Sequence, residues 1–189
     1  MQVRLRPCKE SGHCEMSSGA LLIHVTGQDR PGVTHALTSV LAHHGARVLD
    51  IGQAVIHDAL ALGILIELTT SLRTSTLMTD LLLEAHRLGV QARFTEVSAE
   101  RYADWVGQQA KRRYIVTALG RRLDAEHLAS LAAEVSRAGL NIDRIDRLSA
   151  RVPLAEAQAE PRSCVEFTAS AADPSSEPAE GALRTALAP

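Results

Sequence analysis

Apolar side chains recur along this chain with two different spacings, and these spacings predict where the first strand and helix lie. Residues 21–25 are apolar at every position but one, and a glycine follows shortly after, which is typical of a buried strand. From Val33 onward, apolar residues fall three and four positions apart, which predicts one face of an amphipathic helix. We expect Asp29 to cap that helix at its start and Gly45 to end it in a left-handed conformation.

The pattern continues through two more strands, a second helix and a further strand. Residues 48–56 and 60–68 are rich in apolar residues and are separated by turn residues at 57–58. Residues 77–88 carry a second helical stripe of leucine and alanine, and residues 90–97 follow as a strand. The resulting order β-α-β-β-α-β predicts an α+β unit with a ferredoxin-like fold.

The same order begins again after a polar connector at residues 98–112. Residues 114–119 read as a strand, Asp124 can cap a helix, and residues 140–152 and 164–169 read as two further strands. Glycines recur at matching places of the two units: Gly27 and Gly45 in the first, Gly120 and Gly139 in the second. The chain is therefore expected to contain an internal repeat.

The second unit is expected to be incomplete at its C-terminus. A loop follows its third strand, and residues 182–188 leave room for the first two turns of its second helix, but no residues remain for a closing strand. We therefore divide the chain into a flexible leader at residues 1–19, a first unit at 20–97, a linker at 98–112 and a truncated second unit at 113–189. The missing strand would have to come from elsewhere.

Composition and charge exclude several classes of function. The chain has 189 residues, and 20 Lys and Arg nearly balance 22 Asp and Glu, while aromatic residues make up only 3%. A nucleic-acid-binding protein is therefore not expected, because phosphate neutralisation needs a positive excess and base stacking needs aromatic rings. No run of apolar residues is long enough to span a membrane, and the first residues lack the apolar core of a signal peptide.

The cysteines and histidines predict no metal site. Three cysteines without a secretory signal indicate reduced thiols and a cytoplasmic protein. Cys8, His13 and Cys14 lie close in sequence, but their spacing matches no standard pair of metal-binding arms.

Catalysis on this chain is not expected either. The sequence contains none of the common nucleotide-binding, nucleophile or zinc-protease motifs. Asp143 and Asp146 alternate with Arg144 and Arg147, which favours an ion-paired strand face over a pair of catalytic carboxylates.

The segment Gly-Gln-Asp-Arg-Pro-Gly-Val at residues 27–33 is the strongest candidate for a ligand site. It joins a strand to the start of a helix, where free backbone N–H groups and the helix dipole can hold a carboxylate. Gly32 lets a ligand approach its backbone, and Asp29 offers an acceptor for an ammonium group. A small zwitterion suits this pair of charges. These residues alone leave a structural alternative open, in which Asp29 only caps the helix and Gly32 only allows the chain to turn.

The loop and its surroundings resemble the ACT domain, a βαββαβ regulatory module of amino-acid metabolism. The resemblance rests on the Asp-Arg-Pro-Gly-Val run at 29–33, the apolar helix after it, Gly45, and Asp50 with Ile51. The tandem is similar to the N-terminal half of bacterial phosphoserine phosphatases that carry two ACT units. The residues that carry this narrower resemblance are 25–34, 55–56, 60–63, 119–123, 139–145 and 148–149.

The resemblance implies an effector site and a partner. It implies that Asp29, Gly32 and Val33 contact an amino acid, with L-serine, the product of the pathway, as the natural candidate. Asp50 matches a position that is often Asn in ACT sites. Sites of this family lie between two ACT units, so a homo-oligomer, most simply a dimer, is expected. The corresponding positions in the second unit are Gly120 and Asn141.

Departures from the family pattern limit what this chain is expected to do. In the phosphatases, a haloacid-dehalogenase-like catalytic domain with an Asp-x-Asp-x-Thr loop and Mg²⁺ follows the ACT pair, and no Asp-x-Asp occurs here. We therefore expect a regulatory part without catalysis or cofactor of its own, with Mg²⁺ only in the missing catalytic domain. The alternative is a stand-alone tandem-ACT regulator that resembles the glycine cleavage system transcriptional repressor. Residues 121–123 replace the Asp-x-Pro-Gly loop in the second unit.

Overall fold

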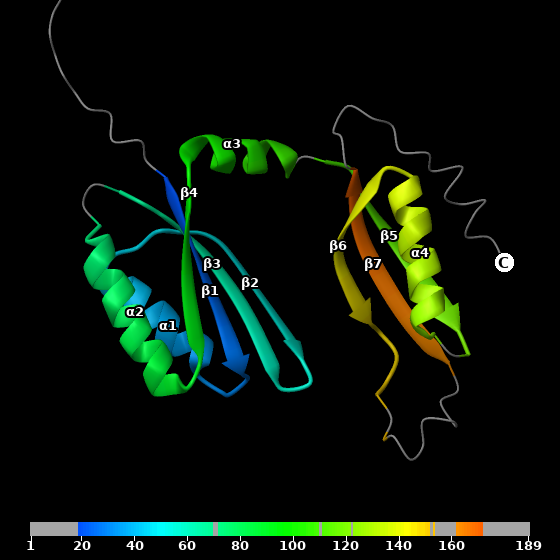
Figure 1. Cartoon of the computed structure of the whole chain (residues 1–189), viewed down its shortest axis with the longest axis horizontal. Helices are drawn as coiled ribbons and strands as arrows, with labels where there is room; N and C mark the ends of the chain where they lie inside the picture. Colours follow the sequence, from blue (N-terminus) through cyan, green and yellow to red (C-terminus); the bar gives the residue numbers. More distant parts are fainter. Residues whose placement is uncertain are drawn as a thin grey trace, which may run out of the picture. The chain divides into compact units, whose positions relative to one another are not determined.

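The computed structural model describes residues 19–69, 72–109, 111–121, 123–151, 153 and 162–171. The chain divides into two compact units between Trp105 and Val106 (Figure 1). The elements in order are β1 (Ala20–Gln28), α1 (Val33–His43), β2 (Val48–Ile56), β3 (Ala59–Glu67), α2 (Thr74–Leu88), β4 (Gln91–Val97), α3 (Ala99–Gln108), β5 (Arg113–Gly120), α4 (Ala125–Arg137), β6 (Leu140–Arg147) and β7 (Ser163–Ala171). None of the helices in these ranges is long and apolar enough to cross a membrane.

The first unit is a four-stranded antiparallel sheet with two helices on one face. The strand order is β2-β3-β1-β4, so β1 and β3 are central and β2 and β4 are the edges. Figure 1 shows α1 and α2 side by side against this sheet. The predicted β-α-β-β-α-β order and ferredoxin-like fold are confirmed for this unit.

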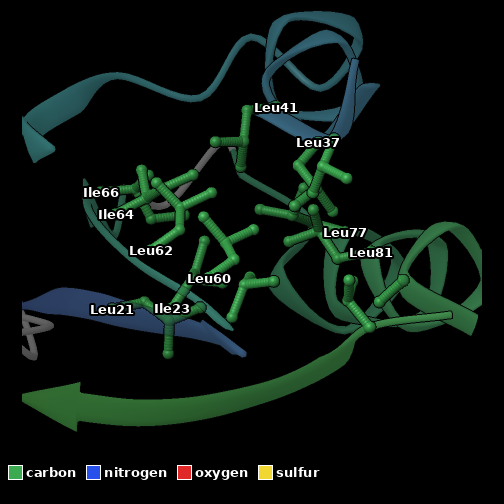
Figure 2. Packing of buried hydrophobic residues seen from close by; sticks show 14 residues of the cluster. Leu21, Ile23, Leu37, Leu41, Leu60, Leu62, Ile64, Ile66, Leu77 and Leu81 are labelled. Carbon is green, nitrogen blue, oxygen red and sulfur yellow. The ribbon is translucent and has the colours of Figure 1, made fainter. Parts of the chain in front are cut away.

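The core of the first unit lies between the helices and the central strands (Figure 2). Alternate residues of β1 and β3 face the helices, as the period of two in a strand requires. Each fully buried aliphatic side chain contributes about 1.5–3 kcal/mol relative to an exposed one. The residues labelled in the figure, all at most 3% exposed, are Leu21, Ile23, Leu37, Leu41, Leu60, Leu62, Ile64, Ile66, Leu77 and Leu81.

The second unit repeats the first three strands and the first helix. Its sheet has the order β5-β7-β6, which corresponds to β1-β3-β2, and α4 corresponds to α1. Phe167 on β7 is fully buried, and Val135 of α4 packs with Leu140 and Ala169. The predicted second helix at 182–188 and the predicted leader, apart from Gly19, lie outside the described residues.

Two predicted segments differ from the structure. The linker at 98–112 contains a ten-residue helix, α3, that the apolar spacing of the sequence does not predict. Ser98 begins it by accepting the N–H of Arg101 at 3.3 Å, and Tyr102 and Trp105 form a ring contact of 5.8 Å along one side. The strand expected at 140–152 ends earlier, at Arg147.

Candidate functional site

The backbone of the loop at residues 29–32 is hydrogen-bonded to the turn of the neighbouring hairpin. β1 ends at Gln28, which lies opposite Ala59, the first residue of β3. The N–H of Asp29 then donates to the carbonyl of Asp58 at 2.7 Å, in the turn that joins β2 to β3. The loop before α1 and this hairpin turn are therefore held together at one end of the sheet.

The carboxylate of Asp29 does not cap α1, so the expected cap is wrong. The helix begins at Val33, its N-cap residue is Gly32, and no side chain makes a capping hydrogen bond. The side chain of Asp29 is exposed, and within the described part of the chain no hydrogen bond or ion pair reaches its carboxylate. This acid therefore stands at the loop with its charge available to a ligand.

Gly32 adopts a backbone conformation that other residues rarely take. Its φ of 93° is left-handed, and a Cβ built there would meet nothing within 4 Å. The requirement for glycine thus comes from the backbone angle and not from crowding. The same openness leaves the backbone of this residue accessible.

The first backbone N–H groups of α1 lack strong partners. The N–H of Val33 reaches only the carbonyl of Arg30, at 3.4 Å, and the first regular helical bond is that of Ala36 to Gly32 at 2.9 Å. The N–H groups of Thr34 and His35 lie in the first turn of the helix, where no carbonyl one turn earlier can accept their hydrogen bonds. With the positive end of the helix dipole, these groups form a place where an anion can bind.

Further polar side chains surround the loop. Arg30 donates from Nη2 to Oε1 of Gln28 at 2.8 Å, which holds a positive charge beside the acid at position 29. A hydrogen bond from the ring of His57, 2.6 Å from Oδ1, is the main cause that lowers the pKa of Asp58. The loop thus presents an acidic and a basic side chain next to each other, beside a hairpin turn that carries a His57–Asp58 hydrogen bond.

Asp50 does not lie near the loop within the same unit. It is opposite Leu65 on β3, and Leu65 is opposite Leu22 on β1. Gln28 lies six residues further along β1, which at 3.3 Å per residue is roughly 20 Å. The structure therefore brings Asp29, Gly32 and Val33 together and leaves Asp50 near the other end of the edge strand.

The corresponding positions of the second unit are arranged differently. Asp124 caps α4, as predicted, by accepting the N–H of His127 at 3.2 Å, and this bond is the main cause that lowers its pKa. Gly120 ends β5, while Asn141 lies at the level of Arg113, roughly 23 Å away along the strand. The structure does not bring these two residues together.

Polar side chains on β6 and β7 are partnered with one another. The side-chain amide of Asn141 donates to Oδ1 of Asp143 at 3.1 Å, and the hydroxyl of Ser170 donates to the same oxygen at 3.0 Å. Arg144 and Asp146 form an ion pair at 2.6 Å, so the predicted ion-paired strand face is present in part. Among the described residues no group of three or more His, Cys, Asp or Glu side chains could hold a metal ion.

Sequence comparisons match this chain to a domain family and, among other relatives, to two enzymes. A family model for the ACT domain matches residues 20–95. Phosphoserine phosphatase SerB2 of Mycobacterium tuberculosis is 35% identical over 131 residues, which are 69% of this chain and 31% of that protein. A phosphoserine phosphatase of Streptomyces coelicolor is 34% identical over 168 residues, which are 89% of this chain and 36% of that protein. The chain thus spans about a third of the length of these relatives.

A solved structure supports the same fold for both units. The crystal structure of a protein described as a glycine cleavage system transcriptional repressor superimposes with a TM-score of 0.61 at 15% identity. The superposition covers 90% of this chain and 92% of that one. At this identity the likeness concerns the fold alone.

Proposed function

Because the first unit of this chain belongs to the ACT domain family, we propose that the chain is an amino-acid-sensing regulatory region whose effector binds at the loop of residues 29–33. The observation that carries the proposal is the start of α1, where an uncapped helix end follows, within four residues, a carboxylate that has no partner among the described residues. These two features match the two charges of a free amino acid.

The carboxylate of the ligand binds to the helix end. Val33 makes only a long hydrogen bond of 3.4 Å to Arg30, so its N–H can turn to a better acceptor at low cost. Gly32 carries no Cβ, and nothing lies within 4 Å of the position that one would occupy. A carboxylate therefore reaches these amides without displacing any side chain.

The ammonium group of the ligand binds to Asp29. The N–H of this residue is bonded to Asp58, which fixes the backbone, while its carboxylate is exposed. Charge-assisted hydrogen bonds contribute about 1.5–3 kcal/mol each. Two or three of them, less the cost of ordering the ligand, correspond to a Kd from about 1 mM to some tens of micromolar.

A second ACT unit completes the site with Asp50. β2 is an edge strand whose Ile51, Val55 and Ile56 are 47%, 38% and 78% exposed. Two copies of such an edge tend to pair. An antiparallel pairing centred on Gly52 places Asp50 of one copy opposite Ala54 of the other, two residues from the end of β2 that adjoins the loop. The chain is then a homodimer, and each site has residues from both copies.

L-serine is the effector that we propose. The two matched enzymes are phosphoserine phosphatases, and hydrolysis of phosphoserine yields serine. A regulatory part that senses serine, the product, would make the rate of serine synthesis depend on the serine concentration. We accordingly expect no phosphatase activity from the chain alone, because the sequence offers no Asp-x-Asp pair for a phosphoaspartate and Mg²⁺.

Calorimetric titration of the full chain with each of the twenty amino acids tests the proposal. Serine should give the tightest binding, and Asp29→Asn should weaken it about tenfold, which is ~1.4 kcal/mol. Asp124→Asn is the matched control, because that aspartate also lies near the start of its unit's first helix but is used as a helix cap. Unchanged binding of serine by the Asp29 variant would exclude the assigned site.

The stand-alone regulator is the second candidate. The observation in its favour is the fold, because the repressor superimposes with a TM-score of 0.61 over 90% of this chain. The same titration separates the two candidates: a preference for glycine over serine would favour the regulator.

A further inference from the structure

A glutamine interrupts an apolar row on the edge strand of the first sheet. Gln53 of β2 pairs with Leu62 of β3, which is 2% exposed in the core. Directly paired residues of antiparallel strands lie on the same face of the sheet, so Gln53 is on the face that the helices cover. Ile51 and Val55, two positions before and after it on the same face, are both apolar. Burial of apolar surface therefore does not explain a polar group at position 53.

Within the described residues, the side-chain oxygen of Gln53 has a hydrogen-bond partner and the side-chain nitrogen has none. Oε1 accepts the hydroxyl of Thr34, the second residue of α1, at 2.7 Å. Nε2 carries two N–H groups that can donate. The bond to Thr34 thus holds the amide in place and leaves these donors for another molecule.

The amide of Gln53 lies next to the position that we assign to the carboxylate of the effector. The backbone N–H of Thr34 belongs to the first turn of α1, whose donors lack helical partners, and the hydroxyl of the same residue holds Gln53. In an amino acid, the side chain begins at the carbon that carries the carboxylate. A short side chain on a ligand bound at the helix start is therefore within reach of Gln53.

We propose that Gln53 makes this site specific for serine by donating a hydrogen bond from Nε2 to the serine hydroxyl, with Thr34 as the residue that positions the amide. This inference rests on the function proposed above and adds the group that recognises the side chain. The loop at residues 29–33 meets only the carboxylate and the ammonium group, which all free amino acids share. Glycine and alanine carry no side-chain oxygen, so they leave the amide without a partner.

The expected preference is moderate because the side chain of Gln53 is exposed. When alanine is bound, water can take the place of the hydroxyl and satisfy the amide. The net contribution of one neutral hydrogen bond corresponds to roughly fivefold to tenfold in affinity. Serine should therefore bind about fivefold to tenfold more tightly than alanine.

Calorimetric titration of the full chain with L-serine and with L-alanine tests the proposal. Gln53→Met keeps the length of the side chain and removes the amide. It should weaken serine to the affinity of alanine and leave alanine unchanged. Gln91→Met is the matched control, because Gln91 is also exposed and lies on the other edge strand, β4, so its replacement should keep the wild-type preference. The ratio of the two affinities is measured within each variant, so a partly unfolded sample does not alter it.

Two variants of Thr34 test its positioning role. Thr34→Ser keeps a hydroxyl that can donate to Gln53 and should keep the preference for serine. Thr34→Val removes that donor and should lose most of the preference. A residue that only stabilised the helix start would affect both amino acids equally, so an unchanged affinity ratio in Thr34→Val would contradict the positioning role.

Failure of this inference can be told apart from failure of the proposed function. If Gln53→Met keeps the wild-type ratio of affinities while Asp29→Asn still weakens both amino acids, Gln53 does not recognise the hydroxyl and the site at the loop stands. If the wild-type chain binds neither amino acid, or if Asp29→Asn binds both as tightly as wild type does, the site itself is wrong and the role of Gln53 falls with it.

Discussion

The hydroxyl of Thr34 donates a hydrogen bond of 2.7 Å to the side-chain oxygen of Gln53. Thr34 lies in the first turn of α1, and Gln53 lies in the middle of the edge strand β2. The start of the helix is therefore tied directly to the edge that we assign to dimer formation. A ligand bound at the helix start lies next to Thr34, and a partner bound at the edge strand lies next to Gln53, so both binding events adjoin the same hydrogen bond.

Replacing Thr34 by Val should remove this tie while keeping the shape of the side chain. We expect a loss of about 1 kcal/mol in the free energy of unfolding, the typical net value of one hydrogen bond. Urea unfolding measures it. Thr79→Val is the matched control, because its hydroxyl bonds only to the carbonyl of Ser75 in its own helix, at 3.0 Å. A loss that is no larger for Thr34→Val than for the control would contradict the role of this bond.

Gly32→Ala should destabilise the first unit. Its φ of 93° is left-handed, and an L-residue in that region is strained by about 1–2 kcal/mol. Thermal unfolding measures the effect. Gly52→Ala is the control, since its φ is not positive and a Cβ there would meet nothing within 4 Å. If both variants unfold at the same temperature, the backbone angle at position 32 is not what requires a glycine.

The cap of α4 should make the stability of the second unit depend on acid. The N–H of His127 holds the pKa of Asp124 below its ordinary value of 3.8. The unfolded chain therefore takes up this proton at a higher pH than the folded one does, so the stabilisation is present above about pH 4 and is lost as the pH falls through the lower folded pKa. Asp124→Asn keeps a capping oxygen that does not titrate.

The measurement is the difference in unfolding midpoint between wild type and Asp124→Asn across the acid range. The difference should be largest near neutral pH and should shrink as the pH falls below about 4. Asp104→Asn serves as the control for general charge effects, because Asp104 lies in α3 and not at a helix start. A difference that stays constant with pH would show that the charge on Asp124 contributes nothing.

Ile51→Lys should weaken self-association. Ile51 is 47% exposed on the edge strand, and a charge placed there opposes pairing with a second copy. Leu83→Lys, at a 65% exposed position on α2, is the control. Sedimentation equilibrium at about 50 μM, a concentration that detects a weak interface, compares the two. Dimers that persist in the Ile51 variant but not in the Leu83 variant would show that the dimer interface lies on the helices and not on β2.

The central strands and the two helices of the first unit could be predicted because each buries one regular face. β3, for example, alternates buried Leu60, Leu62, Ile64 and Ile66 with less buried neighbours. The apolar pattern does not predict α3, because none of its residues is buried and its stripe of Tyr102, Trp105 and Val106 lies within a polar connector.

The error at Asp29 has a local cause. A cap at this position requires Arg30 to begin the helix, but the residue before a proline is disfavoured in helical conformation, and Pro31 follows. The helix therefore starts three residues later, at Val33. Asp124 directly precedes its helix and is not followed by a proline, so an aspartate caps the helix at that position.

The position of Asp50 could not be predicted from its distance along the chain. The sequence shows only that Asp50 follows the first helix closely. Its distance from the loop depends on the register in which β2 pairs with β3. That register pairs it with Leu65 and so separates it from Gln28 by most of the length of the sheet.

The two repeated units begin their first helices in opposite ways, and this difference has a thermodynamic consequence. α4 carries its own cap, whereas α1 begins at Gly32 without one. An anion bound at α1 stabilises that helix start as Asp124 stabilises α4. A molecule that binds only the folded state raises the folding equilibrium constant by the factor 1 + [L]/Kd. The melting temperature of the first unit then becomes a readout of effector concentration, while that of the second unit stays constant.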